Sequence, residues 1–347
     1  MRLYTIFITG LAIIVLAGCN GRNASTKNFS MTVDSKKKNI QLQDKIKVNI
    51  KNKKDHAIDS VVIELAGRKT ATVNDSIALT DVKPGRQEVS ATVFYNGTSE
   101  TLKRTITILS NIKPKVYSYE IINTYPHDIN AYTQGLEFYK DTLYESTGQR
   151  GESTLRKTDY KTGKVLNQIK LNDIYFGEGI TILNNKIHML SWQSKKGFIY
   201  DVNTMELLSS FTYGKSKEGW GLCNDGEKLY KSEGTEKIWI LNPKTLVEEG
   251  YIQTVTNTSV FSKANELEYV NGKIYANTYQ KDGVMIINPE NGIIEGVIDF
   301  RGLKGKVTQH PELDVLNGIA YNPQTKTFFI TGKNWDKLFE VKIIEKS

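Results

Sequence analysis

The sequence predicts an all-β protein in which a small immunoglobulin-like β-sandwich precedes a five-bladed β-propeller. Three observations favour this fold class. Apolar and polar residues alternate with period two from Phe29 to about Ser110, as in half-buried strands. A pattern of short apolar strands then recurs five times between residues 117 and 347. The 27 Gly, 18 Tyr and 12 Phe beside only 7 Pro in 347 residues are typical of many short strands and turns.

The first 20 residues, MRLYTIFITGLAIIVLAGCN, place an apolar run that ends at Ala17 behind Arg2. The run is short and weakly flanked for a membrane span. Its end, LAGC, resembles a bacterial lipoprotein signal, whereas a plain secretory signal is the alternative. The resemblance implies a signal peptide over residues 1–18 and lipidation of Cys19. We therefore expect a lipid-anchored protein of the bacterial cell envelope, periplasmic or on the outer-membrane surface, with residues 19–28 as a polar tether.

Residues 29–112 contain about seven short alternating segments separated by turn signals, KPG at 83–85 and NG at 96–97. This pattern predicts the immunoglobulin-like sandwich, although no cysteine pair or core tryptophan accompanies it. No catalytic constellation is visible in this part of the chain. The segment NIKPKV, residues 111–116, is the predicted domain boundary.

The formal net charge is +8, and eight lysines lie between Lys36 and Lys54. This cluster indicates a solvated face of the sandwich, and an anionic membrane surface or cell-wall polymer is the alternative partner. No nucleic-acid partner is expected, because no binding motif accompanies the charge.

Metal and disulfide chemistry have little support in the sequence. After cleavage Cys223 is the only thiol, which excludes an intramolecular disulfide and favours a buried structural cysteine. The four histidines lack ligand spacing, which disfavours a zinc site. We expect a monomer that requires no metal and no cofactor for catalysis, and the sequence leaves open a structural divalent cation.

The five repeats of the second part begin with similar segments, starting 44, 42, 45 and 52 residues apart. This period fits four-stranded propeller blades over residues 117–347. The segment VYSYEIINTYP, residues 116–126, is expected to complete the last blade and so to leave no exposed edge strand.

Equivalent positions of the blades form rings about one axis, so aligned residues should meet. The residues that open the inner strands are Gln134, Glu178, Trp220, Asn265 and Asn317. A second column, at the end of the next strand, contains Gly148, Trp192, Gly234, Tyr279 and Lys333. With Tyr132 and Phe176, which precede the first column by two residues, these columns predict an apolar cup that holds a few polar groups.

Several of these segments, YPHDINAYTQGLEF, YFGEGIT, GWGL, NELEYVNGKIYAN, DVLNGIAY and TGKNWDKLFEVKI, resemble the plant and bacterial type of glutaminyl-peptide cyclotransferase. The resemblance covers about residues 117–347 and implies a five-bladed propeller that converts N-terminal glutamine of peptides or proteins to pyroglutamate and releases ammonia. It implies that the essential acid is Glu178 and that the other site residues are Gln134, Trp192, Trp220, Asn265 and Lys333. Tyr132 and Tyr279 stand where the family has phenylalanine and tryptophan. This difference leaves open which peptides the site prefers.

Cyclisation requires the α-amine to lose a proton and the leaving nitrogen to gain one. A single carboxylate with a raised pKa can do both in turn, and Glu178 is the candidate. The flanking glycines are expected to let the substrate backbone approach it. Trp192, Trp220 and Tyr279 would exclude water, and Gln134 and Asn265 would hold the amine and the γ-amide. Lys333 either stabilises the developing oxyanion or pairs with Glu178, and the sequence does not decide between the two.

Two other functions are compatible with the sequence. Glu178, Asn265 and Asn317 loosely resemble the ligand set of a metal-dependent lactonase-like propeller hydrolase, although Trp220 and Lys333 fit such a site poorly. A non-catalytic cell-surface binding lipoprotein is the third hypothesis, with the sandwich as its working part.

Overall fold

The computed structural model describes residues 27–70 and 76–346, and these are built almost entirely of strands. One short 3₁₀ helix, η1 (Lys304–Lys306), is the exception within these residues. The predicted signal peptide, Cys19 and the tether up to residue 26 lie outside the described residues. No helix among the described residues has the length and apolar character needed to cross a bilayer.

The N-terminal part consists of two small sheets. One has the strand order β1 (Phe29–Ser35), β2 (Lys45–Asn52), β5 (Ile77–Ala78). The other has the order β4 (Arg68–Lys69), β3 (Ile58–Leu65), β6 (Gly85–Tyr95), β7 (Thr98–Ile108). Both sheets contribute to one hydrophobic core, in which Phe29, Ile46, Val89 and Ile108 are each at most 1% exposed. The alternating pattern therefore marks residues that face this shared core.

The turn between β6 and β7 follows directly from its sequence. Asn96 and Gly97 have φ values of 48° and 71°, and Tyr95 pairs with Thr98. Two central residues with positive φ are the requirement of a type I′ hairpin turn, which the dipeptide Asn-Gly meets best.

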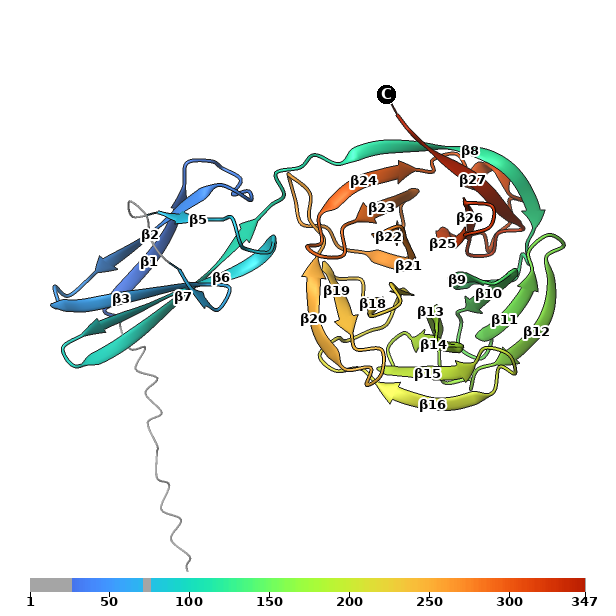
Figure 1. The fold of residues 1–347 in the computed structure, drawn as a ribbon, viewed down its shortest axis with the longest axis horizontal. Coiled ribbons are helices and arrows are strands. Elements are labelled where there is room, and N and C mark those ends of the chain that lie inside the picture. Colours follow the sequence, from blue (N-terminus) through green and yellow to red (C-terminus); the bar gives the residue numbers. More distant parts are fainter. Residues whose placement is uncertain (1–26, 71–75, 347) are drawn as a thin grey trace, which may run out of the picture.

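The second part is a ring of five four-stranded antiparallel units (Figure 1). The first unit contains β9 (Thr133–Tyr139), β10 (Thr142–Thr147), β11 (Thr154–Asp159) and β12 (Lys164–Lys170). The second contains β13 (Gly177–Leu183), β14 (Lys186–Ser191), β15 (Lys196–Asp201) and β16 (Leu207–Thr212). The third contains β17 (Leu222–Asn224), β18 (Leu229–Ser232), β19 (Lys237–Leu241) and β20 (Glu248–Gln253). The fourth contains β21 (Ala264–Val270), β22 (Lys273–Thr278), β23 (Gly283–Ile287) and β24 (Ile294–Asp299).

The fifth unit is completed by a strand from the other end of the sequence. It contains β25 (Leu316–Asn322), β26 (Thr327–Gly332), β27 (Lys337–Glu345) and β8 (Lys115–Pro126). β8 pairs antiparallel with β27 from Lys337↔Pro126 to Glu345↔Tyr117, so the expected pairing of residues 116–126 with the last repeat is confirmed. β8 also pairs in parallel with β24, which joins the fourth and fifth units into one eight-stranded sheet.

The first strand of each unit lies innermost, and these strands contact one another in the cyclic order β9, β13, β17, β21, β25 and back to β9 (Figure 1). They approach so closely that a Cβ atom at the glycine positions would overlap the main chain of the next strand. A Cβ on Gly179 would lie 2.6 Å from the Trp220 carbonyl oxygen, and one on Gly221 would lie 1.9 Å from that of Asn265. The repeated glycine after the strand-opening residue is therefore a packing requirement of the ring.

The third unit differs from the expected repeat. Its inner strand begins at Leu222, so Trp220 precedes the strand, whereas Gln134, Glu178, Asn265 and Asn317 lie within theirs. Trp220 still keeps its place in the ring, because its carbonyl oxygen accepts the Gly179 N–H at 2.6 Å and its own N–H donates to the Ser232 carbonyl.

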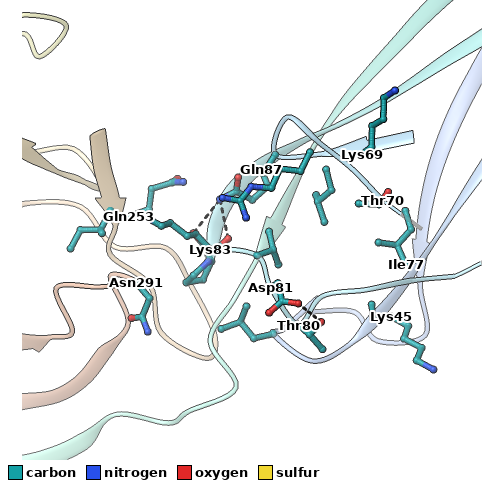
Figure 2. A pocket seen from close by; sticks show the side chains of 18 of the residues that line it. Lys45, Lys69, Thr70, Ile77, Thr80, Asp81, Lys83, Gln87, Gln253 and Asn291 are labelled. Carbon is teal, nitrogen blue, oxygen red and sulfur yellow. Dashed lines mark hydrogen bonds between the residues drawn. The ribbon is translucent and has the colours of Figure 1, made fainter. Parts of the chain in front are cut away.

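The two parts meet beside β20 and β24 (Figure 1). The Gln253 side-chain amide bonds both main-chain groups of Arg86, at 2.9 and 3.2 Å, and the Arg86 guanidinium lies 2.7 Å from the Glu236 carboxylate. Next to these contacts a cleft of about 1040 Å³ separates the two parts (Figure 2). Lys45, Lys69, Lys83 and Asp81 line it from the first part, and Gln253 and Asn291 from the ring.

We predict that Gly221→Ala lowers the free energy of unfolding by about 1–3 kcal/mol or more, because the new methyl group would overlap the Asn265 carbonyl. Gly250→Ala is the matched control, since no atom lies within 4 Å of its added Cβ. Urea unfolding of both variants checks this. Equal stabilities would show that the inner strands can separate.

Candidate active site

The ring contains a cavity of about 200 Å³. It is lined by nine residues: Tyr132, Gln134, Phe176, Glu178, Trp192, Trp220, Asn265, Tyr279 and Lys333. The structure therefore brings together all residues of the two sequence columns and their flanking aromatics except Asn317, Gly148 and Gly234, which do not line the cavity. Trp192, Tyr279 and Lys333 each follow directly after the second strand of their units, β14, β22 and β26.

Glu178 places its carboxylate in this cavity with its two oxygens in different environments. Oε1 accepts a hydrogen bond from the Gln134 side-chain amide at 3.2 Å. Oε2 is buried and has no hydrogen-bond partner among the described residues. Burial raises the pKa of this carboxyl well above its usual range, while nearby Lys333 lowers it and Glu218 raises it. The unpartnered oxygen can therefore accept a proton or a hydrogen bond from a bound molecule.

Asn317 orients the side chain of Gln134. The Asn317 amide nitrogen donates to the Thr133 carbonyl at 2.9 Å and to the Gln134 side-chain oxygen at 3.1 Å. Because the Gln134 oxygen faces Asn317, its NH₂ group must face Glu178. Asn317 thus does not line the cavity itself, but it positions Gln134, which does.

Aromatic rings form the walls. Phe176 packs edge-on against both Tyr132 and Trp192, with centroids 6.2 and 5.5 Å apart. On the other side Trp220 packs edge-on against Tyr279 at 5.4 Å. Edge-to-face contacts of this kind add to the stability that comes from burying the rings.

The glycines of the second column make room for these rings. A Cβ on Gly148 would lie 2.3 Å from the Phe176 ring, and one on Gly234 would lie 2.5 Å from the Trp220 ring. The expectation that the glycines around Glu178 admit substrate is wrong. Gly177 faces the Thr147 carbonyl and Gly179 faces the Trp220 carbonyl, so both serve packing between strands.

Lys333 is buried, and no carboxylate of the described residues pairs with it. Its Nζ lies 4.6 Å from the centre of the Tyr132 ring and 5.4 Å from that of Tyr279. Its Nζ lies more than 4 Å from both carboxylate oxygens of Glu178, so the two side chains form no ion pair. Burial lowers its pKa, and the charges of Glu178 and Asp314 oppose that shift. The cation is therefore held by aromatic faces and long-range attraction.

Two carboxylates behind the walls were not predicted from the sequence. Asp314 accepts the Tyr132 hydroxyl at 2.8 Å. Glu218 Oε2 accepts the indole N–H groups of both Trp192 and Trp220, each at 2.8 Å. Glu218 directly precedes the GWGL motif, and that adjacency was the available signal. Within residues 27–70 and 76–346, no three His, Cys, Asp or Glu side chains are grouped to hold a metal ion.

Comparisons with known proteins agree on one family. The family model described as glutamine cyclotransferase matches residues 89–343. The chain is 36% identical over 241 residues to a glutaminyl-peptide cyclotransferase of Arabidopsis thaliana, which covers 68% of this chain and 75% of the relative. The crystal structure of Myxococcus xanthus glutaminyl cyclase matches with a TM-score of 0.62 and 33% identity, over 68% of this chain and all of that one.

We predict that the stability of Glu178→Gln, relative to that of the parent chain, increases as pH rises. A carboxyl whose pKa is raised on folding binds its proton more tightly in the folded state, so the stability of the parent falls once the unfolded chain ionises above about pH 4. The glutamine side chain does not ionise, so the variant does not lose stability in this way. Urea unfolding at pH 4 and pH 8 should therefore give a difference that grows with pH, and a constant difference would contradict the raised pKa.

Proposed function

The chain belongs to the glutamine cyclotransferase family, and on this premise we propose how its cavity converts N-terminal glutamine of peptides to pyroglutamate with release of ammonia. The observation that carries the proposal is the buried Glu178 carboxylate, with one oxygen fixed by Gln134 and the other unpartnered.

Glu178 acts as general base and then as general acid. Its unpartnered Oε2 accepts a proton from the α-amine as the nitrogen attacks the γ-amide carbon of the same residue. The carboxyl then gives this proton to the departing nitrogen, which leaves as ammonia. Burial raises the pKa of Glu178 toward the range in which both transfers are efficient.

The aromatic walls fold the substrate side chain back on its own amine. A cavity of about 200 Å³ walled by Phe176, Trp192, Trp220 and Tyr279 has room for a small side chain and little water. Holding both reacting groups in contact can lower the barrier by up to about 7–11 kcal/mol. Gln134 and Asn265, the two amide side chains that line the cavity, are the candidates to bind the amine and the γ-amide.

Lys333 stabilises the negative charge that develops on the γ-carbonyl oxygen. The absence of a close pair with Glu178 among the described residues supports this role over the alternative of a salt bridge. The Tyr132 and Tyr279 rings hold the ammonium group in place without neutralising it.

We infer that the ring is a five-bladed β-propeller with the catalytic role, and that residues 29–112 form an immunoglobulin-like sandwich. The cyclic contacts of the inner strands and the shared core of the two N-terminal sheets support this. We further propose a monomer anchored in the bacterial cell envelope through a lipid on Cys19, which the sequence LAGC supports. No cofactor takes part in the proposed steps.

The family match and the sequence identity favour the cyclotransferase over the lactonase and the non-catalytic binding protein.

We predict that the purified chain releases ammonia from a dipeptide with N-terminal glutamine, and that a chelator leaves the rate unchanged. Glu178→Gln should lower kcat by about 10²–10⁴-fold, because the proton carrier is lost. A coupled ammonia assay with mass detection of pyroglutamate measures both. An unchanged rate in Glu178→Gln would exclude this residue from proton transfer, and loss of activity in chelator would require a metal.

We predict that Lys333→Met lowers kcat by about 10²–10³-fold with little change in KM, as expected for an oxyanion stabiliser. Lys263→Met is the matched control, because Lys263 lies 5.9 Å from the same Tyr279 ring but is exposed and does not line the cavity. A change in KM alone would assign Lys333 to substrate binding instead.

A further inference from the structure

Glu218 is not part of the cavity lining, yet one of its oxygens bonds two of the cavity's walls. Oε2 accepts the indole N–H of Trp192, which follows β14, and that of Trp220, which precedes β17. The bonds are both 2.8 Å long, as in hydrogen bonds to a charged acceptor. We propose that Glu218 is a positioning residue, whose carboxylate fixes both indoles in the orientation that cyclisation requires. This inference rests on the proposed function.

The ring contacts alone do not fix the tryptophans. Trp192 touches the Phe176 ring and Trp220 touches the Tyr279 ring, each through edge-to-face packing. Such packing tolerates rotation of an indole about its χ2 bond, which has broad minima. A directional N–H bond selects one orientation, and a shared acceptor makes the positions of the two indoles depend on each other.

The segment that carries Glu218 is itself held along its main chain. The Glu248 carboxylate accepts the N–H groups of Lys215 and Ser216, at 2.6 and 3.0 Å, and Glu233 accepts that of Lys217 at 2.9 Å. Lys231, fully buried, donates to the Glu218 carbonyl at 2.9 Å and also to the Ser216 hydroxyl. Four consecutive residues are thus fixed by buried charged groups, so the carboxylate is in place before substrate binds.

Glu218 also acts on Glu178 through its charge. The charged and titratable groups around Glu178 are Lys333, Glu218 and the hydroxyls of Tyr132 and Tyr213. Lys333 lowers the pKa of Glu178, and Glu218 opposes it. Loss of the Glu218 charge should therefore move the acidic limb of the kcat/KM profile to lower pH.

Two substitutions separate the hydrogen bonds from the charge. Glu218→Ala removes both, so KM for a glutamine dipeptide should rise about tenfold or more. Glu218→Gln keeps an oxygen that can accept indole N–H groups, so KM should stay within about threefold while the acidic limb shifts to lower pH. Glu227→Gln is the control, because it removes the charge of an exposed carboxylate in the same unit that does not hold this segment. It should change neither quantity.

Indole resonances give a test that does not depend on activity. The chain has four tryptophans, and in ¹H–¹⁵N spectra Glu218→Ala should move the signals of Trp192 and Trp220 and leave those of Trp239 and Trp335 in place. Unmoved signals, a parental KM in Glu218→Ala, or the same defect in Glu227→Gln would overturn the proposal. A parent chain that releases no ammonia would instead refute the proposed function, and the indole spectra would still decide the role of Glu218. If Glu218→Ala does not fold, the pH profile and spectra of Glu218→Gln decide.

Discussion

The close approach of the inner strands is the constraint on which the rest of the ring depends. Gly135, Gly179 and Gly221 each face the main chain of the next inner strand, so each strand fixes the position of its neighbour. The side chains that precede the first two glycines, Gln134 and Glu178, therefore project from a backbone that has no room to shift. The precision of the cavity comes from this packing, because a catalytic group must be held to a fraction of an ångström.

The fourth unit shows why one buried acid is structural and another is available for chemistry. Glu266 stands where the four other units have glycine, and its two oxygens accept the N–H groups of Leu136 and Ile319. Burial raises the pKa of Glu266 as it does that of Glu178. Both oxygens of Glu266 are occupied, whereas Oε2 of Glu178 is unpartnered and faces a cavity. The shift in pKa is thus shared, and the unsatisfied oxygen distinguishes the two acids.

The sequence was sufficient to predict which residues meet, because a ring converts alignment into proximity. Gln134, Glu178 and Asn265 share one column, and Trp192, Tyr279 and Lys333 share the other, and all six line one cavity. The sequence was not sufficient to predict Glu218 or the role of Asn317. Glu218 lies in a connection between units, outside the repeat, and its segment is held by main-chain bonds to Lys231 and Glu233. Periodicity carries no information about such bonds.

The cavity combines two kinds of support that meet at Glu178. From one side, Asn317 orients Gln134, and Gln134 fixes one oxygen of the acid through a chain of neutral amides. From the other side, Glu218 holds the indoles and adds a negative charge near the acid, while Lys333 adds a positive one. The amides set the geometry of the carboxylate without altering its charge, whereas Lys333 and Glu218 adjust its proton affinity in opposite directions. The geometry of the Glu178 carboxylate and its proton affinity are therefore set by different residues, whereas Glu218 links that proton affinity to the orientation of the indoles.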